Sequence, residues 1–220
     1  MKKNFLTILS LGTWLVAHLH ADAQQIASQN HRTNVNYDSL RIVLETMHDS
    51  DQNIRRILID SVGLDSPEAP KYLQQMANID TKNRGNLEII LEKYGWIEQS
   101  KIGEKAAAGI FYIIQHSDIE LMEKYFPQMK ALAARGEASM VLTAMMEDRL
   151  LMWKGKKQIY GTQATTGLRP NNRLAVWPIE NPSQVNALRK KAGFPTTVEE
   201  NAKGMNADYD PHEILPPPKN

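Results

Sequence analysis

Cysteine is absent from the 220 residues of the chain, and an excess of charge of one sign is lacking as well. Without cysteine the sequence excludes disulfides, redox-active thiols, thiolate metal sites and a lipidated cysteine. The 26 basic residues nearly balance the 25 acidic ones. Because proteins that track nucleic acids or anionic membranes need a basic surface, we expect neither nucleic acid nor a membrane as a partner.

Motifs of several common enzyme classes are also missing. The chain has no Gly-x-x-x-x-Gly-Lys-Ser/Thr, no Gly-x-Gly-x-x-Gly and no Gly-x-Ser-x-Gly sequence. Nucleotide hydrolysis, dinucleotide redox chemistry and α/β-hydrolase chemistry therefore lose their usual support. Beyond residue 23 the histidines lack the His-Glu-x-x-His motif and any other paired spacing. We therefore expect no metal site and no cofactor.

Residues 1–23 have the pattern of a cleaved signal peptide. Lys2 and Lys3 precede an apolar run over residues 5–19, and residues 21–23 are Ala-Asp-Ala, the small-x-small pattern that a signal peptidase recognises. The apolar run is shorter than the roughly 18 to 20 residues that span a bilayer, which disfavours an uncleaved anchor. We therefore expect an exported soluble protein, periplasmic or secreted, that begins at Gln24 and makes no membrane contact after cleavage.

Apolar residues recur every three or four positions after the leader, which predicts helices. The helices are expected over residues 38–63, 66–76, 80–95, 102–114, 121–132, 140–153 and 181–193. Residues 140–153 are apolar on nearly all sides, which is typical of a central helix. Residues 158–163 and 174–178 read as short extended segments around a Gly/Pro/Asn loop, which predicts a β-hairpin.

The fold class is therefore mainly α, a single domain of about six or seven helices with one late β-hairpin. Composition divides the chain into the signal peptide, a flexible polar lead-in over residues 24–36, the helical domain over residues 37–205, and a proline-containing tail over residues 206–220.

Four polar motifs are set into this pattern. They are Asp51-Gln52-x-x-Arg55, Gln115-His116-x-Asp118, Asp148-Arg149 and Gln158-x-Tyr160-Gly161-Thr162-Gln163. Over about residues 37–194 the series resembles the motifs of an uncharacterised family of bacterial proteins, a domain of unknown function. The chain departs from that pattern at Ile97 and Ser117. The resemblance points to candidate residues without implying a reaction.

His116 is the candidate catalytic residue. A histidine exchanges protons near neutral pH, and Asp118, two residues later, is a candidate to fix the tautomer of its ring. In the alternative, His116 only ends a helix with a favourable charge, and Asp118 only caps the next helix. The sequence gives the two interpretations about equal weight.

Eight further residues are candidates for ligand binding: Asp51, Gln52, Arg55, Arg149, Gln158, Tyr160, Thr162 and Gln163. Asp51 and Arg55 share a helix face, so they form either an exposed ion pair or a guanidinium fork for a carboxylate or phosphate. Arg149 lies four residues after Met145 and three before Met152, so its stem is expected to run along the core, where a charge needs a partner, structural or functional. The side chains of residues 158–163 form either a hydrogen-bonding lip over a pocket or the wet face of a hairpin.

We expect a polar pocket between His116, Arg149 and residues 158–163 that binds a small molecule, anionic or derived from the cell envelope. In this hypothesis Arg55 or Arg149 holds the anionic group, and His116 is the general base or acid of a hydrolytic reaction. The alternative is a non-enzymatic interaction module, in which the same residues form a structural network and the hairpin docks a partner. The sequence does not decide whether the protein is an enzyme.

Overall fold

The computed structural model of the chain describes residues 35–169 and 173–217. The described residues from Asp38 onward belong to one compact unit. The predicted signal peptide, and all but the last two residues of the predicted lead-in, lie outside the described residues. Within the described ranges, no helix has both the length and the apolar character needed to cross a membrane.

α2 (Tyr37–Arg56) buries Leu44, Met47, Asp51 and Ile54, which recur at the helical spacing of three and four residues. A π-helical segment, η1 (Ile57–Val62), continues α2 as far as Gly63. Gly63 has a φ of 81°, a backbone conformation that glycine adopts without strain, and the helix ends there. The predicted helix over residues 38–63 is therefore confirmed.

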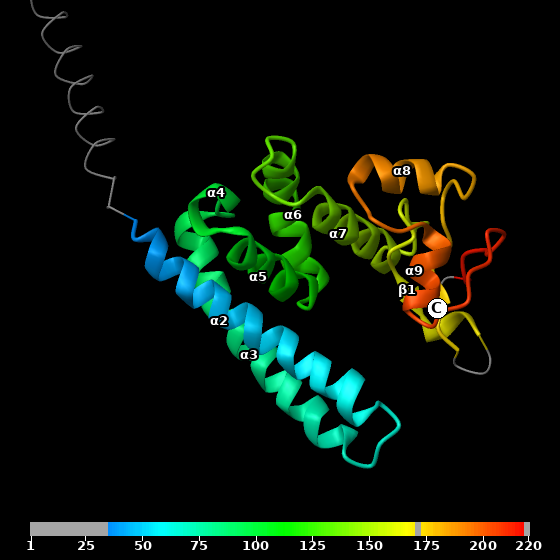
Figure 1. The fold of residues 1–220 in the computed structure, drawn as a ribbon, viewed down its shortest axis with the longest axis horizontal. Helices are drawn as coiled ribbons and strands as arrows, with labels where there is room; N and C mark the ends of the chain where they lie inside the picture. The colour runs from blue at the N-terminus through cyan, green and yellow to red at the C-terminus, as the bar shows by residue number, and fades with distance from the viewer. Residues whose placement is uncertain (1–34, 170–172, 218–220) are drawn as a thin grey trace, which may run out of the picture. The chain divides into compact units, whose positions relative to one another are not determined.

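α3 (Ala69–Tyr94) is one continuous helix of 26 residues that runs antiparallel beside α2 (Figure 1). The predicted division into helices over 66–76 and 80–95 is wrong. Asp80, the first residue of the helix expected over 80–95, lies inside α3, and its carboxylate accepts a hydrogen bond from Arg55. The buried amide of Asn83 donates to the carbonyl of Met47 over 3.2 Å, which joins the two helices.

Four helices follow in the chain: α4 (Gln99–Ile102), α5 (Glu104–Gln115), α6 (Ile119–Ala133) and α7 (Met140–Trp153). The central one is α5, which packs against α3, α4, α6 and α7. α7, the helix predicted to be central, packs against α5, α6 and α8 (Val185–Ala192), while Met140 and Trp153 at its two ends are each 49% exposed. The small side chains of α5, with Gly109 among them, allow its neighbours to approach closely.

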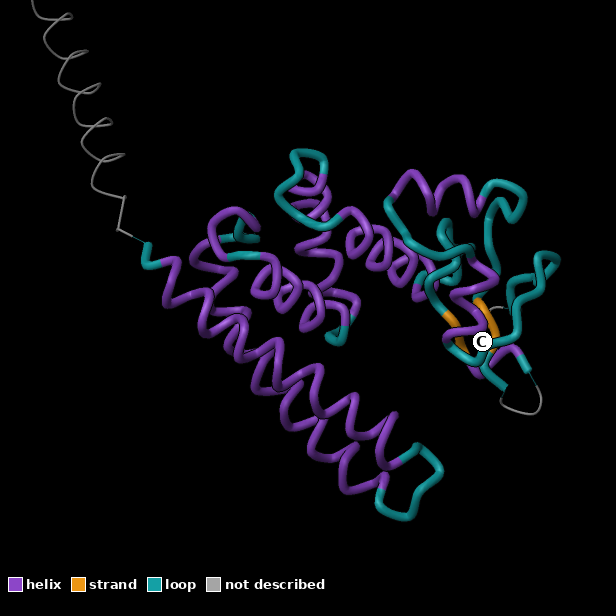
Figure 2. Tube along the Cα trace, in the orientation of Figure 1, coloured by secondary structure: helices purple, strands orange, loops and turns teal. Residues whose placement is uncertain are grey.

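The predicted late hairpin is confirmed, although its strands are shorter than expected (Figure 2). β1 (Ala164–Thr165) pairs antiparallel with β2 (Ala175–Val176), and the 3₁₀ turn η2 (Thr166–Leu168) follows β1. The expectation that residues 158–163 form the first strand is wrong. Within that segment Gln158 alone forms a bridge, to Ile179.

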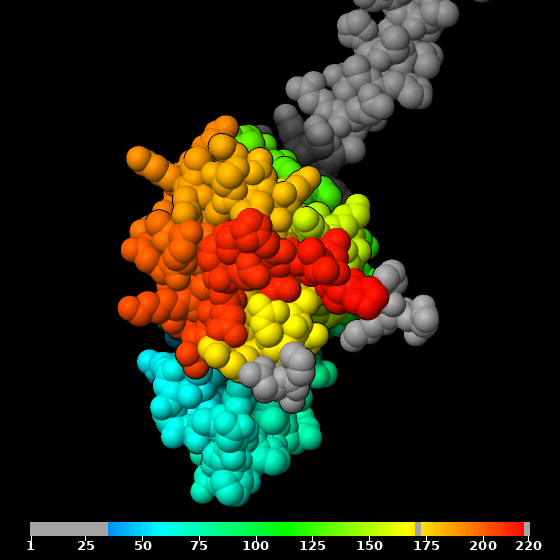
Figure 3. Space-filling view, turned by 90° about the vertical axis from the view of Figure 1, so that its right-hand side faces the viewer, coloured from blue at the N-terminus to red at the C-terminus, as the bar shows by residue number. Residues whose placement is uncertain are grey.

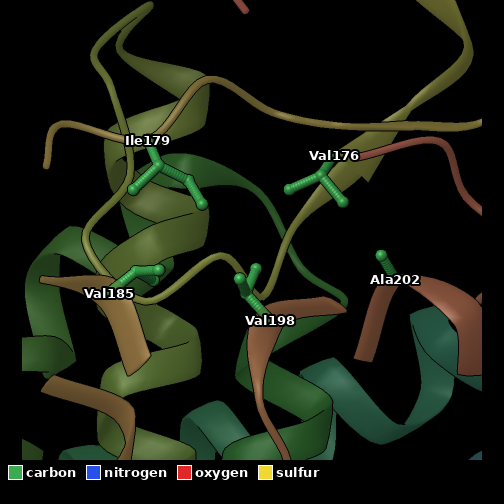
Figure 4. Packing of buried hydrophobic residues seen from close by; sticks show 5 residues of the cluster. All are labelled: Val176, Ile179, Val185, Val198 and Ala202. Carbon is green, nitrogen blue, oxygen red and sulfur yellow. The ribbon is translucent and has the colours of Figure 1, made fainter. Parts of the chain in front are cut away.

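Two short helices, α8 (Val185–Ala192) and α9 (Val198–Gly204), complete the described fold. α8 confirms the helix predicted over residues 181–193. α9 was not predicted, although Thr197 and Glu200 form a capping box at its start, which is a signal that the sequence carries. Side chains from β2, both helices and the loop after β2 form one hydrophobic cluster (Figure 4), made of Val176, Ile179, Val185, Val198 and Ala202.

The last described residues are attached to the hairpin. Asp208 donates its N–H to the carbonyl of Leu174, and its own carbonyl accepts the N–H of Val176. Figure 3 shows the C-terminal segment, in red, against the yellow hairpin segment and the orange helices. With eight α-helices and one two-stranded hairpin among the described residues, the mainly helical fold class is confirmed.

Candidate functional site

Asp51 of α2 and His116, the C-cap residue of α5, form a hydrogen-bonded pair. Oδ1 of Asp51 lies 2.9 Å from Nδ1 of His116. The Asp51 side chain is 1% exposed, whereas that of His116 is 20% exposed. The two helices come this close because α5 has a glycine where they cross: a Cβ at Gly109 would lie 2.8 Å from the carbonyl oxygen of Leu44. A buried carboxylate thus holds a histidine ring that still reaches the surface.

Gln52 and Arg55 also donate to the Asp51 carboxylate, over 2.7 and 2.9 Å. The second terminal nitrogen of Arg55 donates to Oδ2 of Asp80 over 2.9 Å. Burial disfavours the charged form of Asp51, but the hydrogen bond and charge of His116 and the charge of Arg55 outweigh burial, so the pKa of Asp51 lies below its ordinary value. The structure therefore brings four of the predicted site residues together, and their ion pair is buried instead of exposed.

His116 lines a cleft of about 300 Å³ between α2, α3 and the end of α5. The wall of the cleft includes Asp80, Thr81 and Arg84 of α3. Nδ1 of His116 is bonded to Asp51, and within residues 35–169 and 173–217 the other ring nitrogen, Nε2, has no hydrogen-bond partner. Tyr112, one turn earlier on α5, stacks on the histidine ring with the ring centroids 6.1 Å apart. One nitrogen of His116 is therefore available to a molecule in the cleft.

Asp118, the predicted tautomer-fixing partner of His116, is engaged elsewhere. Its carboxylate caps α6 by accepting the N–H of Leu121 over 2.9 Å, and it forms an ion pair with Arg84 at the cleft. The hydrogen bond from Leu121 is the main cause that lowers the pKa of Asp118. Of the two interpretations of this residue, the structure supports the helix cap. The carboxylate beside His116 comes from Asp51, 65 residues away in the chain.

A second polar network surrounds Asp148 of α7, whose side chain is fully buried. Its carboxylate accepts the backbone N–H groups of Ile159, Tyr160 and Thr162 and the hydroxyl of Thr162, over 2.7 to 3.2 Å. Burial raises the pKa of Asp148 in spite of these donors. Residues 158–163 turn around Asp148 because their backbone N–H groups donate to its carboxylate. In a strand, these N–H groups would form hydrogen bonds with a neighbouring strand.

Gln158 and Gln163 belong to the same network, and both are buried. Nε2 of Gln158 donates to the carbonyls of Gln163 and Trp177 over 2.9 and 2.6 Å, and its Oε1 accepts the N–H of Gln163 over 2.9 Å. Arg189 of α8 is 1% exposed and donates to the carbonyl of Tyr160 over 2.8 Å. Sequence reasoning missed Arg189, because nothing distinguishes it from the lysines that follow it. These contacts favour the structural interpretation of residues 158–163.

Arg149 differs from the other candidates. Among the described residues it forms no ion pair and no hydrogen bond, and its Nε is buried without a partner. Burial and the positive charge of Arg55 lower the pKa of Arg149. Within the same ranges, no hydrogen bond or ion pair joins His116 or Arg149 to residues 158–163. The polar residues that were expected around one pocket therefore separate into three groups: the network of Asp51, the network of Asp148, and Arg149, which has no partner among the described residues.

The fold and the site together define a mainly helical protein with an Asp–His pair at a small cleft. In the described part of the chain, no group of three His, Asp or Glu side chains could hold a metal ion. The chain belongs to a family of unknown function, DUF6624, which matches residues 38–210. No curated protein and no solved structure matches the chain. The family match confirms the resemblance to an uncharacterised domain.

Proposed function

We propose that Asp51 and His116 are the general acid–base dyad of a hydrolase. The observation that carries this proposal is the 2.9 Å bond between a partly exposed histidine and a buried carboxylate. The carboxylate favours the tautomer with hydrogen on Nδ1, which leaves the lone pair of Nε2 directed away from Asp51 as a base. Asp51 also stabilises the imidazolium that forms when Nε2 accepts a proton.

In the reaction we infer, Nε2 of His116 takes a proton from a water molecule in the cleft while that water attacks an ester, amide or phosphoester bond. The water oxygen forms the new bond, the leaving group departs with the electron pair of the broken bond, and His116 returns the proton to it. Asp51 stays ionised, because Gln52 and Arg55 support its charge. A cleft of about 300 Å³ suits a small molecule, anionic or derived from the cell envelope.

A substrate panel tests the dyad: nitrophenyl esters, a nitrophenyl phosphate monoester and diester, and soluble cell-wall fragments. On any hydrolysed substrate we expect His116→Ala to lower kcat/KM by about 100-fold or more, and Asp51→Asn by about 10-fold or more. His48→Ala is the matched control, since His48 also lies beside an aspartate, Asp49, and its side chain has the same 20% exposure as His116. Hydrolysis by His116→Ala at the wild-type rate would contradict the proposal.

A non-enzymatic interaction module is the second candidate function. It is favoured by the Asp148 network, in which polar motif residues make their contacts within the protein. In this case His116→Ala and Gln163→Ala each leave a buried group without its partner, and each variant melts several degrees lower. Hydrolysis by the wild type that is lost in His116→Ala and kept in Gln163→Ala supports the dyad. A large drop for both variants, with no hydrolysis by the wild type, supports the module.

We also propose that the protein is exported. The support is the pattern of residues 1–23, with two lysines, an apolar run and Ala-Asp-Ala. Intact-mass measurement of protein from its native host tests this proposal. We expect a chain that begins at Gln24, and a mass that includes residues 1–23 would contradict cleavage.

A further inference from the structure

We propose that Arg149 of α7 binds an oxyanion, a carboxylate or phosphate group, through its unpartnered guanidinium. That this anion is part of the substrate rests on the proposed function, whereas the anion site itself does not.

The guanidinium of Arg149 is the one that remains available among these arginines in the described chain. Arg55 donates through both terminal nitrogens, to Asp51 and Asp80. Arg189 donates to the backbone carbonyls of Tyr160 and Thr196. Arg149, by contrast, makes no hydrogen bond or ion pair with any residue in 35–169 or 173–217.

Arg149 lies where a free charge is unfavourable. Its side chain is partly buried on α7, and its Nε is fully buried without an acceptor. Burial, and to a smaller extent the positive charge of Arg55, lowers the pKa of Arg149. A guanidinium whose Nε is buried without an acceptor opposes folding, and a bound anion supplies the missing partner. A ligand explains this position better than packing does.

The chemistry of the group defines the ligand class. A guanidinium presents two parallel N–H groups that match the two oxygens of a carboxylate or phosphate. Arg55 is neutralised by Asp51 and Asp80, so the charge that an approaching anion meets is that of Arg149. The site therefore fits a single oxyanionic group. Phosphate and acetate, tested separately, distinguish a phosphorylated ligand from a carboxylate.

Thermal melts of the full chain in sodium phosphate or sodium acetate, with ionic strength held constant by sodium chloride, test the proposal. At saturating phosphate or acetate we expect the melting temperature of the wild type to rise by about 2–4 °C. In chloride alone, Arg149→Met should melt about 2–4 °C higher than the wild type, because it removes the unpaired charge, and it should not respond to either anion. Arg56→Met is the matched control, since Arg56 is exposed, and it should respond as the wild type does.

Retention of the anion response by Arg149→Met would overturn the proposal, as would a wild type that responds to neither anion. Calorimetric titration of phosphate and acetate into Arg149→Lys keeps the test decisive if Arg149→Met does not fold. We expect Arg149→Lys to bind at least about 10-fold more weakly, because it keeps the charge and loses the fork. A larger response to phosphate indicates a phosphorylated ligand, and a larger response to acetate a carboxylate.

The anion site and the dyad can fail separately. His116→Ala should keep the anion response. If His116→Ala hydrolyses substrate at the wild-type rate while Arg149→Met loses the anion response, the dyad is wrong and the anion site stands. The opposite result, lost hydrolysis with an anion response that does not depend on Arg149, overturns the anion site alone.

Discussion

Asp51 combines nearly complete burial with an ionised carboxylate, and the two are compatible because His116, Gln52 and Arg55 all donate to it. An aspartate with a lowered pKa stabilises the folded state only while it is ionised. In the unfolded chain an aspartate titrates near a pKa of about 3.9. The contribution of Asp51 is therefore complete above that pH, and it is lost as the pH falls through the lower pKa of the folded state.

We predict that Asp51→Asn lowers the free energy of unfolding by about 2 kcal/mol near neutral pH, because His116 and Arg55 lose their charged partner. The difference from the wild type should shrink as the pH falls below about 4. Urea denaturation in neutral and in acidic buffer measures both effects. Asp49→Asn is the control, since its exposed carboxylate pairs with His48 and Lys105, and it should change little in either buffer. A difference that does not vary with pH would contradict the role of the charge.

The sequence identified both members of the dyad but did not pair them. Spacing relates residues within one helix, whereas Asp51 and His116 are 65 residues apart and meet only where α2 crosses α5. Asp118 was nearer in the sequence and was therefore assigned to His116, although its position before α6 also fits a cap. The glutamines of residues 158–163 were assigned to a ligand for a similar reason. A polar side chain that forms hydrogen bonds with buried backbone groups has the same sequence pattern as one that binds a ligand.

At the scale of the helix and strand, the spacing of apolar residues predicted which helices and strands exist more accurately than where they begin and end. The division of α3 at Asp80 was wrong. An aspartate between apolar turns has the sequence pattern of a helix cap, but Asp80 lies inside α3 and accepts a hydrogen bond from Arg55 of α2. Residues 158–163 alternate like a strand, but Asp148 takes their N–H groups. The importance of α5 was underestimated, because close packing at Gly109 depends on which helix lies against it.

Two glycines on neighbouring helices test this packing. We predict that Gly109→Ala lowers the free energy of unfolding by about 1–3 kcal/mol, because its Cβ would lie 2.8 Å from the carbonyl oxygen of Leu44 and would push α5 away from α2. Gly85→Ala is the matched control on α3, where a Cβ would meet nothing within 4 Å, and it should stabilise the protein by about 0.5–1 kcal/mol. Denaturant unfolding of the two variants gives both values. Equal effects of the two substitutions would contradict close packing at Gly109.

At the scale of the whole domain, the C-terminal region is held together by contacts that are distant in the sequence. The cluster of Val176, Ile179, Val185, Val198 and Ala202 is covered by three further side chains, Met205, Ala207 and Tyr209. Its members come from the hairpin, the loop after β2 and two helices, and the covering side chains come from the segment after α9. Composition placed residues 206–220 in a separate tail, because prolines and polar residues dominate there. Local composition does not report that Asp208 completes the hydrogen bonding of β2.

We predict that a chain shortened after Met205 is less stable than the full chain by about 2 kcal/mol, which lowers the melting temperature by roughly 4–8 °C. The shortened chain loses the bond from the N–H of Val176 to Asp208, and Val176 is 2% exposed, so that this N–H becomes a buried donor without an acceptor. It also loses the apolar cover that Ala207 and Tyr209 provide. A chain shortened after Leu215 is the control, since it keeps these contacts and should melt within about 1 °C of the full chain. Melting curves followed by circular dichroism compare the three chains. If the chain that ends at Met205 melted together with the other two, residues 206–215 would contribute nothing to the fold, and the hydrogen bonds beside β2 would have to be replaced by solvent without cost.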